Sequence, residues 1–247
     1  MIIFNLFQNN WLCAILIHLV LISFVQRTSL LTKKGWLHAG ALGTILWGTL
    51  GWQGWLAVVI YLLLGTCVTK LGFAEKQLRG IAEGRGGMRG PENIWGSAAT
   101  GALLAVLIQF EIYSKEILLI GFAASFSAKL ADTFGSEIGK RWGSKTFLIT
   151  SLQPVNAGTD GGVSIEGTLA SVFGSLLMTL AMLKLSIISH GSVFCIVALS
   201  GFLATLLESF IGAFFQNKIP GLTNEVVNFL QTLLSAIIAI LLASLYL

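Results

Sequence analysis

Long apolar stretches, separated by short polar segments, are the feature that most limits how this chain can fold. The 247 residues include 15 Lys and Arg and 11 Asp and Glu, so charged side chains make up only 11% of the sequence. A soluble domain normally carries about twice this charged fraction. A helix needs roughly 20 apolar residues to cross a bilayer. We therefore expect an all-α, polytopic transmembrane helix bundle that forms a single domain over residues 1–247.

Eight apolar stretches are candidate transmembrane spans. Two of them, Gly35–Leu50 and Ile117–Leu130, are short and need polar flanks to complete a crossing. Seven spans is therefore the alternative count. The first stretch has no basic segment before it and no clear cleavage site after it, so we expect a retained span. The other six stretches are Asn10–Val25, Trp52–Val68, Ile94–Phe110, Thr168–Ser189, Ser192–Phe215 and Val226–Leu247.

Basic residues are distributed unevenly among the connecting segments. With the N-terminus outside, only Lys115 and Lys184 of the 15 basic residues fall on the outer side, which satisfies the positive-inside rule. This topology places two long polar segments, residues 70–93 and 129–167, on the cytoplasmic face. The positive charges lie in short loops between apolar runs, so we expect no nucleic-acid partner. The cytoplasmic basic residues are Arg27, Lys33, Lys34, Lys70, Lys76, Arg79, Arg85, Arg89, Lys129, Lys140, Arg141, Lys145 and Lys218.

The segment before the fourth span has the composition of a phosphate-binding loop. It runs from Glu83 to Asn93 and contains four glycines, which allow the backbone to approach a ligand closely. The guanidinium groups of Arg85 and Arg89 match the geometry of phosphate oxygens. Asn93 is a predicted helix N-cap, and exposed N–H groups at a helix start favour an anion. Alternatively, this is a basic loop that only fixes the topology.

A charged segment continues directly from the fifth span. Lys129, Asp132 and Lys140 follow helical spacing along one face, and Asp132 is expected at or just inside the membrane surface. A carboxylate at that depth is costly and usually lines a polar site. Glu137 and Arg141 have the i, i+4 spacing of a helical ion pair. A salt-bridged helix end is therefore the alternative interpretation.

The segment before the sixth span is rich in glycine and in oxygen-bearing side chains. Gly158, Gly161 and Gly162 can form a concave array of N–H donors. Carboxylate and amide oxygens nearby are the kind of ligand that magnesium prefers. Thr-Asp-Gly-Gly is also an ordinary turn sequence, which is the alternative. The oxygen-bearing residues are Asn156, Thr159, Asp160 and Glu166.

The last two spans also carry polar residues. Glu208 lies inside the seventh span, and Asn224 and Asn228 lie near the start of the eighth. A carboxylate within a span indicates a functional site. The alternative is a structural hydrogen bond to a neighbouring helix.

Acids suited to a divalent metal and cations suited to phosphates together indicate phosphoryl or nucleotidyl transfer. An apolar bundle around such a site fits a lipid-tailed acceptor. These residues alone do not separate a kinase from a cytidylyltransferase that forms a CDP-lipid. A transporter with Asp132 and Glu208 as coupling carboxylates is a further alternative, but we find neither the inverted repeats nor the interrupted helices typical of transporters.

Three of these segments resemble an integral-membrane family that includes the plant and cyanobacterial phytyl-phosphate kinases. More distantly, they resemble dolichol kinases, phytol kinases and phosphatidate cytidylyltransferases. The likeness extends from about Leu30 to the end of the chain. The segments are Arg89-Gly-Pro-Glu-Asn-Ile-Trp-Gly-Ser-Ala-Ala99, Asp132-Thr-Phe-Gly-Ser-Glu-Ile-Gly139 and Gly158-Thr-Asp-Gly-Gly-Val-Ser-Ile-Glu-Gly-Thr168.

The resemblance implies a kinase of isoprenoid metabolism, including tocopherol biosynthesis. It implies transfer of a phosphoryl group to phytyl phosphate or a similar prenyl monophosphate lipid. The implied donor is a nucleoside triphosphate, with CTP favoured over ATP, and the implied cofactor is Mg²⁺. The resemblance leaves the oligomeric state open.

The resemblance also implies roles for individual residues. Asp132, Glu137 and Asp160 are the expected magnesium ligands and, with Glu166 and Glu208, form the expected catalytic set. Glu208 departs from the family pattern, in which we expect Asp. The expected phosphate-binding residues are Arg79, Arg85, Arg89, Lys129, Lys140, Arg141, Gly158, Gly161 and Gly162, and the expected polar support comes from Asn93, Asn156, Thr159, Asn224 and Asn228.

Overall fold

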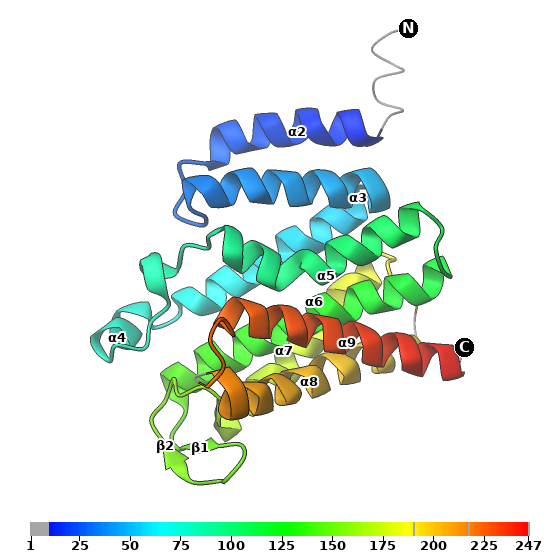
Figure 1. Ribbon diagram of the computed structural model, residues 1–247. Coiled ribbons are helices and arrows are strands. Elements are labelled where there is room, and N and C mark those ends of the chain that lie inside the picture. The colour runs from blue at the N-terminus through cyan, green and yellow to red at the C-terminus, as the bar shows by residue number, and fades with distance from the viewer. Residues whose placement is uncertain (1–9, 190, 217, 247) are drawn as a thin grey trace, which may run out of the picture.

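The computed structural model describes residues 10–189, 191–216 and 218–246, and over these residues the chain is a bundle of long helices (Figure 1). This confirms the predicted all-α membrane bundle. A 3₁₀ turn, η1 (Gly84–Gly87), and a π-helical turn, η2 (Gly212–Gln216), accompany the α-helices. The α-helices are α2 (Asn10–Val25), α3 (Lys33–Lys70), α4 (Phe73–Leu78), α5 (Pro91–Gln109), α6 (Lys115–Trp142), α7 (Ile165–Lys184), α8 (Ser192–Ile211) and α9 (Asn224–Tyr246).

Several helices have the length and composition of membrane spans. Among the described residues, five qualify, namely α3, α6, α7, α8 together with η2, and α9. The apolar helix α2 is shorter, with 16 residues. The chain is therefore a multi-pass membrane protein, whereas the total of eight spans, or seven, stays a prediction.

Helix α3 consists of two arms that meet at Gly51. This glycine has φ 72° and ψ −167°, which is not helical, and its positive φ is one that glycine adopts at little cost. The chain changes direction sharply there, so that the second arm runs back beneath the first (Figure 1). The predicted spans Gly35–Leu50 and Trp52–Val68 correspond to the two arms.

Helix α6 is the centre of the bundle and contacts α3, α5, α7, α8 and α9. Small residues on its neighbours allow close approach. A Cβ atom on Gly101 of α5 would lie 2.6 Å from Phe126, and one on Gly174 of α7 would lie 2.9 Å from the carbonyl oxygen of Leu130. The predicted boundary at residue 129 is wrong, because α6 is one continuous helix of 28 residues that includes the start of the predicted loop.

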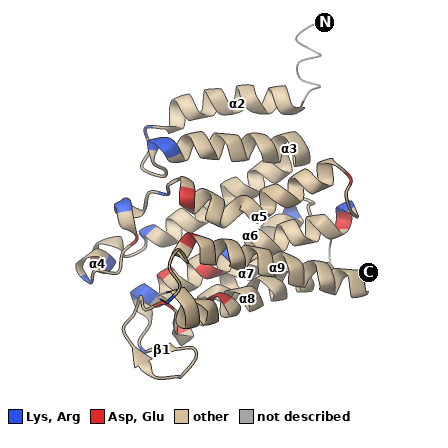
Figure 2. Cartoon of the chain, viewed as in Figure 1, with Lys and Arg blue, Asp and Glu red and all other residues tan. Residues whose placement is uncertain are grey.

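Charged residues and irregular segments gather at one end of the bundle. Figure 2 shows most Lys, Arg, Asp and Glu residues at the end that carries α4 and the strands. A small antiparallel sheet, which the sequence analysis did not predict, lies there with strand order β2-β1-β3. Its strands are β1 (Thr146–Leu148), β2 (Pro154–Val155) and β3 (Gly162–Val163).

Candidate active site

A polar cavity of about 420 Å³ lies at the charged end of the bundle. Its walls come from α3, α5, α6, α7, α8 and α9 and from the loops around residues 83–89 and 157–164. Segments far apart in the sequence therefore contribute to one site. The predicted residues that line it are Arg85, Arg89, Asn93, Lys129, Asp132, Glu137, Lys140, Gly158, Thr159, Asp160, Gly161, Gly162, Glu208, Asn224 and Asn228.

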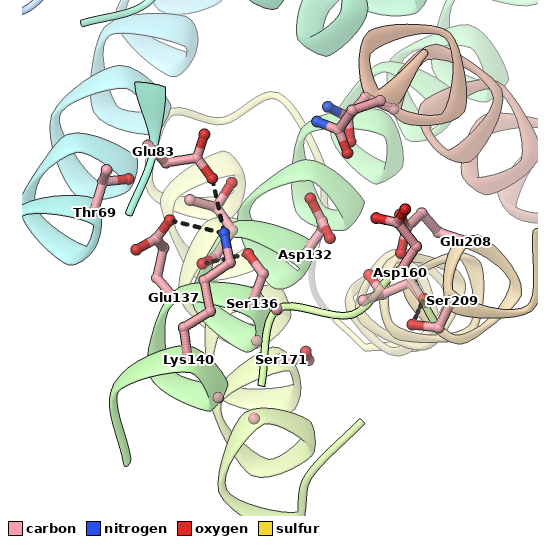
Figure 3. A pocket seen from close by; sticks show the side chains of 18 of the residues that line it. Thr69, Glu83, Asp132, Ser136, Glu137, Lys140, Asp160, Ser171, Glu208 and Ser209 are labelled. Atoms are coloured by element: carbon pink, nitrogen blue, oxygen red, sulfur yellow. Dashed lines mark hydrogen bonds and ion pairs between the residues drawn. The ribbon is translucent and has the colours of Figure 1, made fainter. Parts of the chain in front are cut away.

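Three carboxylates from different elements face one another in this cavity. Asp132 comes from α6, Asp160 from the loop between β2 and β3, and Glu208 from α8 (Figure 3). Both aspartates interact electrostatically with Glu208. Gly161 allows this arrangement, because it has φ 72° and a Cβ atom there would lie 2.6 Å from the carbonyl oxygen of Ser209. The loop can therefore pack directly against the end of α8.

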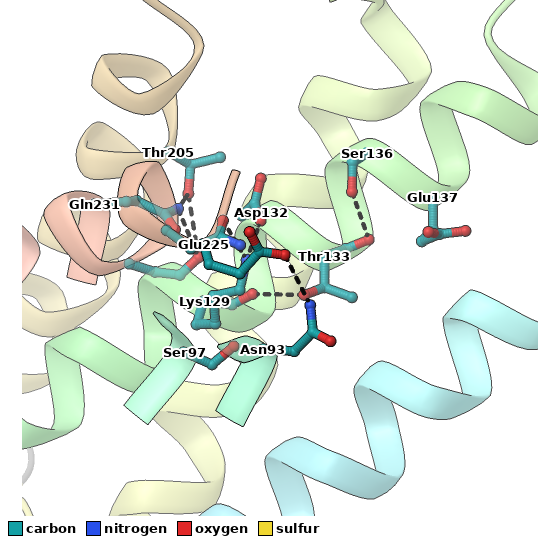
Figure 4. Close-up of polar contacts among 12 residues, drawn as sticks. Asn93, Ser97, Lys129, Asp132, Thr133, Ser136, Glu137, Thr205, Glu225 and Gln231 are labelled. Atoms are coloured by element: carbon teal, nitrogen blue, oxygen red, sulfur yellow. Dashed lines mark hydrogen bonds and ion pairs between the residues drawn. The ribbon is translucent and has the colours of Figure 1, made fainter. Parts of the chain in front are cut away.

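Lys129 provides a buried positive charge beside Asp132. The two side chains form an ion pair on the same helix, and Nζ of Lys129 also donates a hydrogen bond to Oδ1 of Asn228 at 2.8 Å. Lys129 is 5% exposed and Asn228 is 6% exposed. Figure 4 shows Lys129 and Asp132 near Thr205 and Gln231. Nε2 of Gln231 donates to Thr205 Oγ1 at 3.0 Å. Buried polar contacts are therefore present both at the cavity and further inside the helix bundle.

The structure does not assemble the predicted magnesium set of Asp132, Glu137 and Asp160. Glu137 forms a buried ion pair with Lys76, and Figure 3 places it beside Glu83 and Lys140, away from Asp160 and Glu208. Among the described residues, no group of three His, Cys, Asp or Glu side chains is arranged to hold a metal ion. The carboxylates nonetheless fit magnesium chemically, because Mg²⁺ is commonly bound by one or two carboxylates together with substrate phosphates.

The segment between α3 and α5 is attached to the end of α6 by charged contacts. The predicted pair between Glu137 and Arg141 is wrong, because α4 supplies other partners. Glu137 pairs with Lys76, and Arg141 donates to Glu75 at 2.7 Å. Arg79 and Arg141, both expected to bind phosphate, are not among the residues that line the cavity.

Glu83 continues this attachment at the cavity wall. Its Oε1 accepts a hydrogen bond from Nζ of Lys140 at 2.9 Å. Partial burial raises the pKa of the Glu83 carboxyl, but the charge and hydrogen bond of Lys140, together with the charges of Lys129 and Arg89, outweigh it, so the pKa lies below its ordinary value. No role for Glu83 was predicted from the sequence.

Asn93 stabilises the start of α5, although not as the predicted N-cap. The N-cap is Gly90, and Asn93 lies three residues later, where its Oδ1 accepts the Gly90 N–H at 2.9 Å. The same oxygen accepts a hydrogen bond from Arg85 at 2.6 Å. Nδ2 of Asn93 donates to Glu225 of α9 at 3.2 Å. Asn93 therefore connects the basic loop with two helices of the site.

Some predicted residues lie outside the cavity, and other lining residues were missed. Asn156 and Glu166 do not line it, and Glu166 instead accepts the Ser144 N–H at 3.1 Å. The missed residues are polar side chains within apolar stretches, a signal that could have revealed them. They include Tyr61, Thr69, Ser97, Thr133, Ser171, Thr205 and Ser209, together with Glu83 and Glu225.

The profile of the family "Integral membrane protein DUF92" matches residues 16–236 of the chain. The chain belongs to this family. The membership confirms the family resemblance drawn from the three motifs, and it agrees with a bundle of apolar helices. No solved structure matches the chain.

Three relatives of the chain come from very different organisms. The chain is 48% identical over 233 residues to "Uncharacterized membrane protein sll0875" of Synechocystis sp., a match that covers 93% of this chain and 90% of the relative. It is 38% identical over 216 residues to "Protein VTE6, chloroplastic" of Arabidopsis thaliana, covering 85% of this chain and 65% of the plant protein. It is 30% identical over 230 residues to "Uncharacterized membrane protein MJ0933" of Methanocaldococcus jannaschii, covering 92% of each.

Proposed function

We propose that this DUF92 protein is a magnesium-dependent prenyl-phosphate kinase. The substrate is phytyl phosphate or a similar prenyl monophosphate, the product is the diphosphate, and the favoured donor is CTP. The observation that carries the proposal is the cavity in which Asp132, Asp160 and Glu208 gather beside basic side chains at one end of a membrane bundle. The family resemblance and the similarity to the chloroplastic relative support it.

The proposed reaction needs positioning more than acid–base chemistry. An oxygen of the prenyl phosphate attacks the terminal phosphorus of the nucleoside triphosphate and forms a new P–O bond. The bond from that phosphorus to the β-phosphate oxygen breaks, and the nucleoside diphosphate leaves with the electron pair. The attacking oxygen is already anionic near neutral pH, so no strong general base is required. Catalysis then depends on holding the phosphates together and neutralising their charge.

The lining residues suit these tasks. Bound magnesium would supply charge neutralisation at the phosphates, and Asp132, Asp160 and Glu208 are the side chains that would hold it. Lys140 and the N–H groups of Gly158–Gly162 are suited to the donor phosphates. By the positive-inside rule, this end of the bundle faces the cytoplasm, where nucleoside triphosphates are available.

The test is a product assay with the purified protein in lipid nanodiscs. Phytyl phosphate, Mg²⁺ and CTP labelled on the terminal phosphate should give labelled phytyl diphosphate and CDP, whereas phytol should give no product. A cytidylyltransferase would instead release pyrophosphate and form a CDP-lipid. A transporter would show substrate flux into proteoliposomes without a product. If no nucleoside triphosphate yields a prenyl diphosphate, the kinase proposal is wrong.

A further inference from the structure

Arg89 differs from the other basic residues of the cavity. It lines the cavity, but among the described residues no carboxylate forms an ion pair with its guanidinium. A partly buried cation without a carboxylate partner favours an anionic ligand, because the ligand compensates the charge. The other lining cations form the pairs Arg85–Glu92, Lys129–Asp132 and Lys140–Glu83.

The backbone of Arg89 is fixed by the segment that precedes α3. Its N–H donates to the carbonyl of Leu30 at 3.2 Å, and its carbonyl accepts the N–H of Thr32 at 3.1 Å. Gly35 makes this approach possible, because a Cβ atom there would lie 2.6 Å from the Arg89 carbonyl oxygen. The main chain of Arg89 is therefore held at one position beside the first turn of α3.

The side chain of Arg89 is fixed by the second arm of α3. Nη1 donates to the hydroxyl of Tyr61 at 2.5 Å, and the guanidinium carbon lies 5.0 Å from the centre of the Tyr61 ring. Tyr61 is 3% exposed and donates to Ser97 of α5 at 3.2 Å. One turn after Tyr61, Gly65 leaves space for the guanidinium, since a Cβ atom there would lie 2.5 Å from Nη2.

We propose that Tyr61 and Gly65 are positioning residues that hold Arg89 as the recognition group for the phosphate of the lipid acceptor. This inference rests on the proposed function. It explains how the enzyme would select a prenyl phosphate over a prenyl alcohol. A guanidinium offers five N–H donors in one plane, and Tyr61 accepts one of them, so a bidentate contact to phosphate is available. An alcohol would leave the guanidinium without an anion in direct contact, which a site built for a charged partner penalises strongly.

The location of Arg89 assigns it to the acceptor. Tyr61 and Gly65 belong to the apolar stretch Trp52–Val68, so this part of the cavity reaches into the helix bundle. A lipid phosphate with its tail among apolar helices would lie there. Lys140 is close to the end of α6 and pairs with the loop residue Glu83, which suits a soluble nucleotide.

The test measures binding without nucleotide, with farnesyl phosphate and farnesol as probes, in the full chain in nanodiscs. We expect wild type to prefer farnesyl phosphate. Tyr61→Phe and Gly65→Ala should each weaken binding of the phosphate about tenfold, a factor typical of one hydrogen bond to a charged group, and should leave farnesol binding unchanged. The control is Gly121→Ala, which crowds Ile240 at 2.8 Å in the α6–α9 contact and should leave both affinities unchanged.

Steady-state kinetics give a second test. A purely structural role would not change the KM of one substrate selectively. Both variants should raise the KM for the prenyl phosphate about tenfold and leave the KM for the nucleotide unchanged. Tyr61→Phe preserves the ring, so the test does not depend on how well Gly65→Ala folds. Wild-type affinity for farnesyl phosphate in Tyr61→Phe would overturn the positioning role. Equal wild-type affinity for farnesol and farnesyl phosphate would overturn the selectivity.

These outcomes are distinguishable from failure of the proposed function. If wild type makes no diphosphate but prefers farnesyl phosphate, and both variants lose that preference, the kinase proposal fails and lipid-phosphate recognition stands. If wild type makes the diphosphate and the two variants keep its affinity and KM for the prenyl phosphate, the kinase proposal stands and the assignment of Tyr61 and Gly65 is wrong.

Discussion

Lys76 of α4 and Glu137 of α6 form an ion pair in which the two side chains are only 0% and 2% exposed. Nζ of Lys76 also donates to the carbonyl oxygen of Thr69 at 2.8 Å. Each charge is therefore compensated within the protein. The pair attaches the segment between α3 and α5, which carries Glu83, Arg85 and Arg89, to the central helix.

Removing one partner of this pair should destabilise the protein strongly. We expect Lys76→Met to lower the free energy of unfolding by about 3–5 kcal/mol, because the buried Glu137 would lose its close partner and keep only the 3.8 Å contact with Lys140. The double variant Lys76→Met/Glu137→Leu should be more stable than Lys76→Met alone. Denaturant unfolding in detergent micelles measures both. The matched control is Glu75→Gln, which breaks an exposed pair with Arg141 and should cost less than about 1 kcal/mol. A Lys76→Met protein as stable as wild type would contradict the prediction.

Asp132 should be essential for turnover but not for insertion into the membrane. We expect Asp132→Asn to lower kcat at least about 100-fold, because even residues that only support a metal ligand commonly contribute 10–100-fold. The concentration of Mg²⁺ at half-maximal activity should rise in Glu208→Gln, and chelation of Mg²⁺ should abolish wild-type activity. The product assay in nanodiscs measures these effects. Glu116→Gln, at the opposite end of α6, is the control and should behave as wild type. Substantial activity in Asp132→Asn would remove this residue from the site.

The contact between Glu83 and Lys140 should depend on pH. The pKa of Glu83 is lowered in the folded protein, so the contact stabilises fully above the ordinary carboxyl pKa of about 4.3 and is lost as the pH falls through the lower folded value. Amide exchange in residues 79–90, corrected for intrinsic rates, should accelerate between about pH 5 and about pH 3.

Glu83→Gln is the control for this pH dependence. Glu75 also forms an ion pair with α6, so the difference between wild type and Glu83→Gln isolates the contribution of Glu83. The variant should exchange faster at neutral pH and change less on acidification. An identical pH profile in both proteins would show that this contact does not hold the segment.

The two ends of the bundle should face opposite sides of the membrane, with the cavity on the cytoplasmic side. In a variant without native cysteines, Ser151→Cys near the small sheet should react with a membrane-impermeant reagent only from the cytoplasmic side. Ser114→Cys, in the connection before α6, should react only from the other side. Labelling of sealed right-side-out and inside-out vesicles distinguishes the two. Reaction of both cysteines from the same side would overturn the topology.

The membrane bundle was predictable because hydropathy is a local property of sequence. The apolar stretches therefore predicted the helices. The spacing of Lys129, Asp132 and Lys140 predicted that these residues share one helical face. The boundary at residue 129 was wrong because buried polar residues such as Ser127 and Lys129 interrupt an apolar pattern without interrupting a helix. Side chains from neighbouring helices provide the hydrogen bonds and counter-charges that such buried polar residues need. The sequence alone does not show which side chains these are.

The partners of the charged residues were harder to predict than the cavity itself. Arg141 is four residues from Glu137, but α4 places Glu75 and Lys76 against this end of α6, and these contacts replace the local pair. Asp160 reaches Glu208 because Gly161 allows the loop to touch α8. Tyr61 and Gly65 looked like ordinary residues of an apolar span, since their role depends on an arginine that follows more than twenty positions later.

The ion pair between Lys129 and Asp132 lies within a single helix, and this has a consequence for biosynthesis. During translation α6 emerges before α7, α8 and α9, which later cover it. A lone lysine or aspartate at this depth would oppose transfer into lipid. Because the two residues are three positions apart on one face, they can neutralise each other as soon as the helix forms. Helix α6 thus carries its own counter-charge into the bilayer and does not have to wait for the helices that complete the cavity.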